Sequence, residues 1–138
     1  MNQRIIYPTD DGGVSIIVPA PECGLTIEAI AAKDVPAGKP FKIVDVADIP
    51  SDRAFRNAWC VEGNGIGHNH EKCCDITKER LRAERAPLLA ASDVAYMRAQ
   101  EAGASTTAIV AEKQRLRDVT KLVTADLSLD ALKMLKAA

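Results

Sequence analysis

Two apolar helical patterns, separated by a short turn, fill the second half of the chain from Glu71 to about Val123. The turn is expected at Ala102–Thr106, where Gly103 suits the left-handed position that ends many helices. The first pattern carries Ile76, Leu81, Leu88, Leu89, Val94 and Met97, and the second carries Ile109, Leu116, Val119 and Val123. The second set recurs on one helical face. The sequence therefore predicts a helical hairpin in which each helix buries one stripe.

A proline interrupts the first helical pattern. Pro87 removes one backbone hydrogen bond and clashes with the preceding turn, so the helix must kink or restart there. Ser92 and Asp93 offer a second possible start. We expect a kinked helix that continues to about Glu101.

Charged residues of both signs crowd the middle of this helix: Lys78, Glu79, Arg80, Arg82, Glu84 and Arg85. Arg80 and Glu84 are spaced i,i+4, and Glu79 and Arg82 are spaced i,i+3. We interpret the run as a solvated face in which each local ion pair contributes a few tenths of a kcal/mol.

A short helix is expected at the end of the chain. Ser128 is its predicted cap, and Leu129, Leu132 and Leu135 form its apolar side. Because it lies near a terminus, we expect this tail to be weakly docked.

The first sixty residues alternate between strand and helix signals. Strands are predicted over 4–7 and 14–18, joined by an Asp-Gly-Gly turn, and over 39–46, where Phe41, Ile43 and Val46 should pack. A helix capped by Thr26 should run to Asp34. Another, starting at Ser51 or Asp52, should present Phe55 and Trp59 to the core. The predicted order is β-β-α-β-α.

Glycines mark the expected boundary between the two modules. Gly63, Gly65 and Gly67 stand within five residues, which favours a linker over a regular element. We therefore predict an α+β chain with a small α/β module over 1–62, a Gly-rich linker over 63–70, and the helical hairpin with its short last helix over 71–138.

Composition narrows the class of protein. The 138 residues carry a formal net charge of −1, without the basic excess that attracts a nucleic-acid backbone. No apolar run is long enough to cross a bilayer, and the N-terminus has no signal-peptide hydrophobic region. We expect a cytoplasmic protein without nucleic-acid or membrane partners. Its four cysteines should then be reduced thiols.

One cluster of side chains has the ligand types that Zn²⁺ prefers: Cys60, His68, His70, Cys73 and Cys74. Its spacing matches no established zinc-ligand pairing, and Cys60 would have to fold back across the glycines. In the alternative interpretation Cys73 packs as a small hydrophobe with Ile76, and the histidines lie in an exposed turn.

No other pattern indicates catalysis. The chain lacks G-x-G-x-x-G and G-x-x-x-x-G-K-[ST], so no nucleotide loop is expected. Cys–His nucleophilic chemistry would need a cleft, a base and an oxyanion donor. Turn chemistry explains Asp10 and Asp11. We expect a protein that is not an enzyme.

Segments of the hairpin resemble phage tail assembly chaperone-type proteins. These have an R-x-x-R-x-x-L-L-x-x-x-D segment, present here from Arg82 to Asp93, and a closing segment that reads Lys113-Gln114-Arg115-Leu116-Arg117-Asp118 here. The front segment, from Ile5-Ile6-Tyr7 through Asp52–Trp59, looks like small phage and prophage proteins that carry the same hairpin. The Cys/His segment at 60–74 is not part of the pattern.

The resemblance implies a non-enzymatic phage or prophage tail structural or assembly protein that binds another tail component. Expected locations are the host cytoplasm and the virion. Two helices that bury one stripe each need a third surface, which can be the α/β module, a second copy of the chain or a partner helix. The expected contact residues are Leu81, Leu88, Met97, Ile109 and Leu116. No cofactor is expected; the alternative is a small zinc-binding module built on the 60–74 cluster.

Overall fold

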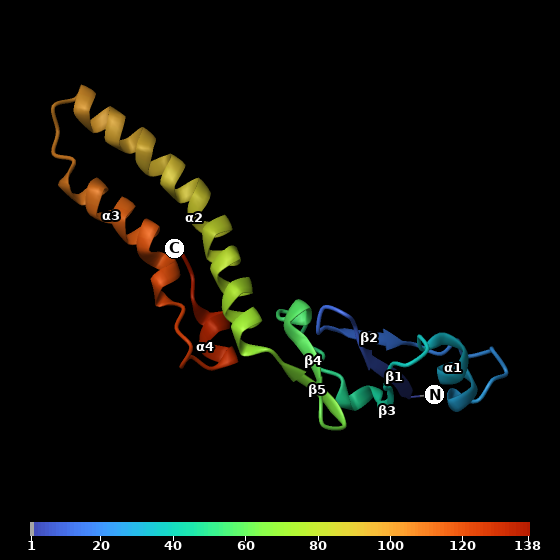
Figure 1. The fold of residues 1–138 in the computed structure, drawn as a ribbon. Helices are drawn as coiled ribbons and strands as arrows, with labels where there is room; N and C mark the ends of the chain where they lie inside the picture. Colours follow the sequence, from blue (N-terminus) through green and yellow to red (C-terminus); the bar gives the residue numbers. More distant parts are fainter. Residues whose placement is uncertain (1) are drawn as a thin grey trace. The chain divides into compact units, whose positions relative to one another are not determined.

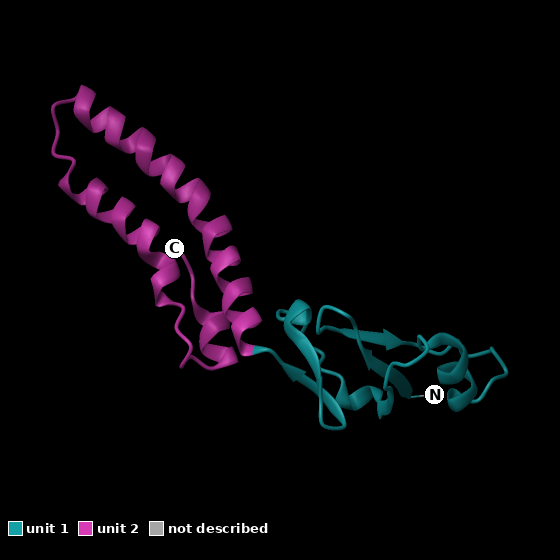
Figure 2. Ribbon diagram, in the orientation of Figure 1, with its two compact units in different colours: residues 1–69 teal, residues 70–138 magenta. Residues whose placement is uncertain are grey.

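The protein has an α+β fold in which the strands precede the long helices along the chain (Figure 1). The structure, a computed structural model, describes residues 2–138. The chain divides between Asn69 and His70 into two compact units, coloured separately in Figure 2. Unit 1 contains all the strands, and unit 2 contains the long helices.

A three-stranded antiparallel sheet forms the centre of unit 1. Strand β1 (Gln3–Pro8) lies between β2 (Val14–Ile17) and β3 (Lys42–Asp45). The turn after β1 needs Gly12, whose φ of 83° suits glycine. The predicted hairpin and third strand are confirmed.

The two faces of β1 carry separate cores, because neighbouring side chains of a strand point to opposite sides. Ile6 packs in a cluster with Val14, Val44 and Trp59. Ile5 packs on the other face with Ile30 and Ala31 of helix α1 (Ile27–Asp34). The predicted cap of α1 is confirmed, since Thr26 Oγ1 accepts a hydrogen bond from Ala29 N at 3.1 Å.

The prediction of a second helix in this unit is wrong. A single 3₁₀ turn, η2 (Arg56–Ala58), stands in its place, and strand β4 (Trp59–Glu62) follows at once. Asp52 accepts from Ala54 N at 2.9 Å, a local bond that competes with a helical start. Trp59 is fully buried, as expected of a core anchor, but from a strand.

The predicted Gly-rich linker over 63–70 is also wrong. Strand β5 (Gly65–His68) pairs antiparallel with β4, and Glu62 faces Gly65 across the turn. Gly63 has a φ of 56° while Asn64 has a negative φ, as in the two-residue turns with glycine first that suit hairpin twist. The three glycines therefore belong to a β-hairpin and not to a flexible linker.

Two side chains expected in the core of unit 1 are exposed. Phe41 is 44% exposed and Val46 is 40% exposed. The strand is shorter than predicted, so Phe41 precedes β3 and Val46 begins a 3₁₀ turn, η1 (Val46–Asp48). Ile43, inside the strand, packs against the Ile5 cluster as expected.

Unit 2 is the predicted helical hairpin. Helix α2 (His70–Glu101) runs through Pro87 without restarting, and α3 (Thr107–Asp118) returns beside it (Figure 1). Gly103 ends α2 with a φ of 67°. Its N–H donates to Gln100 O at 3.1 Å, and Ala104 N donates to Ala99 O at 2.8 Å, which completes a Schellman cap.

The end of the chain folds back onto the base of this hairpin. After the 3₁₀ turn η3 (Val119–Leu122), helix α4 (Leu129–Met134) packs against the first half of α2. Ser128 caps α4 as predicted, accepting from Ala131 N at 3.1 Å. Leu132 and Ala137 are fully buried. The expectation of a weakly docked tail is therefore wrong.

Three arginines connect the elements of unit 2. Arg80 and Arg85 belong to the run that we interpreted as a solvated face with local ion pairs, and that interpretation is wrong for these two side chains. Arg80 donates to Leu132 O at 2.9 Å and to Leu135 O at 2.7 Å. Arg85 donates to Arg117 O at 2.8 Å, and Arg115 donates to Ala137 O at 2.9 Å. The expected local pairs are present as well: Arg80 with Glu84 at 2.8 Å, and Arg82 with Glu79.

Candidate functional site

The five residues expected to contact a partner have very different exposures. Leu81 and Leu116 are buried in the base of the hairpin, where they form its own core. Leu88 and Ile109 are partly buried. Met97 is 61% exposed. Of the five, Met97 has the most side-chain surface available to another molecule.

An exposed apolar surface lies on the half of the hairpin nearer its turn; we call it the distal patch. It consists of Val94 and Met97 on α2 and Val110 on α3. All buried residues of α2 precede Pro87, and α4 lies beside that half of the helix (Figure 1). The distal half is thus a two-helix layer whose outer apolar side chains have no third element of unit 2 over them.

An ion pair between α2 and α3 shows which faces of the two helices lie together. Lys113 Nζ of α3 lies 2.6 Å from Asp93 Oδ1 of α2 and 5.2 Å from the centre of the Tyr96 ring. One helical turn nearer the connecting loop, α2 presents Met97 and α3 presents Val110, on the faces that carry Asp93 and Lys113. The patch therefore draws on both helices along one edge of the hairpin.

The sequence contained a signal for one member of this patch. Val110 is apolar but stands one position from Ile109, off the inward stripe of its helix, whereas Val94 and Met97 belong to the apolar pattern that the sequence predicts to be buried. Apolar residues off the core-facing stripe of an otherwise polar helix indicate an outward contact surface.

The five candidate metal ligands are divided between the two units. Cys60 and His68 are in the β4–β5 hairpin of unit 1, while His70, Cys73 and Cys74 are in the first turns of α2. Over residues 2–138, no group of three or more histidine, cysteine, aspartate or glutamate side chains is arranged to hold a metal ion. All four cysteines are thiols.

One histidine–cysteine pair does come together. His70 Nδ1 lies 3.6 Å from Cys74 Sγ, one helical turn along α2. Nε2 of the same ring lies 2.6 Å from Leu127 O. A carbonyl oxygen only accepts, so Nε2 carries a proton, and the Nδ1 of the neutral ring presents its lone pair to the sulfur. Cys73 is fully buried.

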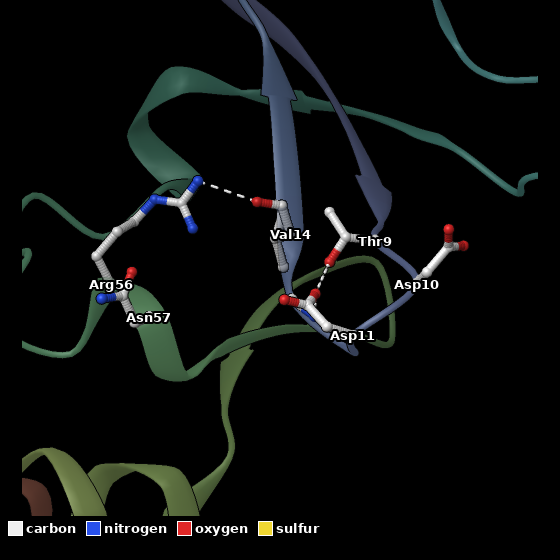
Figure 3. A pocket seen from close by; sticks show the side chains of 7 residues that line it. Thr9, Asp10, Asp11, Val14, Arg56 and Asn57 are labelled. Carbon is white, nitrogen blue, oxygen red and sulfur yellow. Dashed lines mark hydrogen bonds between the residues drawn. The ribbon is translucent and has the colours of Figure 1, made fainter.

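A pocket of unit 1 lies beside the turn that joins β1 and β2 (Figure 3). Its volume is about 490 Å³, and its polar side chains belong to Thr9, Asp10, Asp11, Arg56 and Asn57. Arg56 donates to Val14 O at 3.0 Å, and its guanidinium lies 4.6 Å from the centre of the Trp59 ring. Asp11 accepts from Thr9 and from Gly13 N. These side chains therefore hold the turn and the sheet, as expected for Asp11.

The two adjacent carboxylates of this turn do not act as a pair. Asp10 lies 2.6 Å from Lys39 Nζ, and Figure 3 shows its carboxylate directed away from that of Asp11. A general acid and base that share a substrate must face one site. The geometry here is that of turn and ion-pair chemistry.

A smaller apolar pocket of about 320 Å³ lies between β1 and the β4–β5 hairpin. Ile6, Pro8, Phe41 and Val61 contribute to its walls. The exposed ring of Phe41 lines this pocket. The sequence did not predict the pocket, because Phe41 was expected to be buried in the core.

Two carboxyl groups on the surface of α3 have lowered pKa values. Arg115 donates to Glu112 at 2.8 and 2.6 Å, and this hydrogen bonding lowers the pKa of the Glu112 carboxyl. Gln114 and then Lys121 lower the pKa of Asp118 in the same way. Both carboxyls are exposed and paired with neighbours on the surface.

No family model, curated protein or solved structure matches this chain. Along residues 2–138, no helix combines the length and the apolar character needed to cross a membrane.

Proposed function

We propose that this protein is a non-enzymatic phage or prophage tail structural or assembly protein that acts by binding another tail component through its helical hairpin. The motif resemblance of residues 76–119 supports the class of protein. The distal patch of Val94, Met97 and Val110 supports the mode of action, and it is the observation that carries the proposal.

The distal patch suits contact with a helix of the partner. Its side chains come from two antiparallel helices, and an amphipathic helix buries its apolar stripe well on such a layer. The charged pair of Asp93 and Lys113 borders the apolar centre, an arrangement found at interfaces with a polar rim. A second copy of the chain is a further possible occupant of the same surface.

The host cytoplasm is the proposed location during assembly, and the virion is the proposed location if the contact persists in the finished tail.

Co-purification with tail proteins tests the proposal. The full chain is co-expressed with each product of the flanking genes, and bound proteins are identified after affinity purification. We expect one tail component to co-purify, and the triple variant Val94→Glu/Met97→Glu/Val110→Glu to bind it at least about tenfold more weakly, because each charge would be buried at the contact.

Val18→Glu is the matched control, since Val18 is 64% exposed but belongs to unit 1. It should leave binding unchanged. Flanking genes that encode no tail protein, or equal binding by the triple variant and the control, would argue against the proposal.

A further inference from the structure

We propose that His70 and Cys74 form half of a zinc site, which two copies of the chain complete as a Cys₂His₂ centre. This inference concerns the first turns of α2 and does not depend on the proposed tail function. It starts from the pair of ligand atoms, His70 Nδ1 and Cys74 Sγ, that lie 3.6 Å apart.

The separation of the two atoms fits a shared zinc ion. With Zn–S of about 2.3 Å and Zn–N of about 2.0–2.1 Å at a tetrahedral angle, the sulfur and nitrogen lie about 3.5 Å apart. Without a metal, Cys74 Sγ lies 3.6 Å from His70 Nδ1 and 4.0 Å from Thr124 O, so the thiol proton has an acceptor on either side. Zinc would take the place of the thiol proton, which is released to solvent on binding.

The orientation of the imidazole is already set. The hydrogen bond of 2.6 Å between Nε2 and Leu127 O fixes the ring and leaves Nδ1 as the coordinating atom. Metal-binding histidines usually donate their other N–H to a carbonyl or carboxylate, which orients the ring for the metal. Here the segment before α4 supplies that carbonyl.

The surroundings admit a cation from solvent. The pair opens into a pocket of about 450 Å³, whose charged lining residues are Glu71, Asp75 and Lys78. Two carboxylates against one ammonium leave the lining net negative. His70 and Cys74 are both only partly buried, so a metal bound to them remains reachable from outside.

One chain supplies two of the four ligands that a structural zinc site needs. In the described part of the chain no third histidine, cysteine or carboxylate completes the set. A two-fold axis through the metal would add the same nitrogen and sulfur from a second copy, which gives Cys₂His₂. Two thiolates would then balance the charge of Zn²⁺.

Titration of untagged, metal-free full-length protein with zinc chloride tests this inference. We expect half an equivalent of zinc per chain and a zinc-dependent dimer by light scattering after gel filtration. Cobalt(II) in place of zinc should give the visible spectrum of a tetrahedral thiolate site.

Cys74→Ser and His70→Asn should each weaken zinc binding by at least about 100-fold and abolish the dimer. Cys60→Ser and Cys23→Ser are matched controls and should bind like the parent chain, with circular dichroism to confirm that every variant folds. Absence of zinc binding, one zinc per monomer, or full binding by the folded Cys74→Ser variant would each overturn the inference.

Discussion

Arg80 on α2 donates a hydrogen bond of 2.9 Å to the carbonyl oxygen of Leu132 on α4. Its second terminal nitrogen donates to Leu135 O, and the guanidinium also pairs with Glu84. The last carbonyls of a helix have no partner within the helix, so a cationic side chain at this end satisfies them and complements the helix dipole. Arg80 thus holds the end of the chain against the base of the hairpin.

Replacement of Arg80 should destabilise unit 2. Arg80→Ala removes the hydrogen bonds to Leu135 O and to Leu132 O, the second of which keeps a bond of 3.4 Å from Leu135 N, and we expect a loss of about 1–3 kcal/mol in the free energy of unfolding. The measurement is urea unfolding followed by far-ultraviolet circular dichroism, which reports chiefly on the long helices. Fluorescence of Trp59, the single tryptophan, follows unit 1 in the same samples.

Arg82→Ala is the matched control for this variant. Arg82 lies on the same helix and pairs with Glu79 one turn earlier. An exposed pair of this kind contributes little, so the change should stay within about 0.5 kcal/mol. Equal effects of the two variants would contradict the role given to Arg80.

A side chain at Gly63, the first central position of the β4–β5 turn, should destabilise the protein. Gly63→Ala forces an L-residue into a φ of 56°, although nothing lies within 4 Å of the added carbon. The expected cost is about 1–2 kcal/mol of backbone strain. Gly65→Ala adds the same methyl group into open space at a position without positive φ, and it should be close to neutral.

Chemical denaturation monitored by Trp59 fluorescence compares the two glycine variants, because β4 begins at Trp59. An unchanged midpoint for Gly63→Ala would indicate that the turn does not hold the left-handed conformation in solution.

The Glu112–Arg115 pair should contribute to stability on the alkaline side of the glutamate titration. The hydrogen bond from Arg115 lowers the pKa of Glu112 in the folded state. Stability rises with pH wherever the unfolded carboxyl binds more protons than the folded one, which here is the range between the two pKa values. The contribution is therefore present above the pKa of the unfolded glutamate, and it is lost as the pH falls through the lower pKa of the folded state.

Carboxyl ¹³C titration by NMR checks this expectation. Arg115→Ala should raise the pKa of Glu112 toward its ordinary value. Asp126 serves as the internal reference, since its lowered pKa arises from Thr124 and its own backbone and should not change. A Glu112 titration unaffected by the substitution would contradict the assignment to Arg115.

Local signals predicted most of the helix and turn boundaries correctly. Thr26 and Ser128 cap the helices that follow them, and Gly103 ends α2, because each effect depends on backbone groups within four residues. The stretch from 50 to 70 was predicted wrongly. There Trp59, at the start of the β4–β5 hairpin, is buried against β1 and β2, which lie more than forty residues earlier in the chain. No local sequence pattern reveals such a long-range contact.

The sequence alone determined that this chain is α+β and that its second half is a helical hairpin, since periodicity, caps and the glycine at the turn all act locally. Only the tertiary structure decided which apolar residues of that hairpin become core and which stay outside. Leu81 and Met97 belong to the same predicted pattern, yet Leu81 is buried and Met97 exposed. The physical reason is the return of α4, which packs against the first half of α2 and leaves the second half with α3 alone.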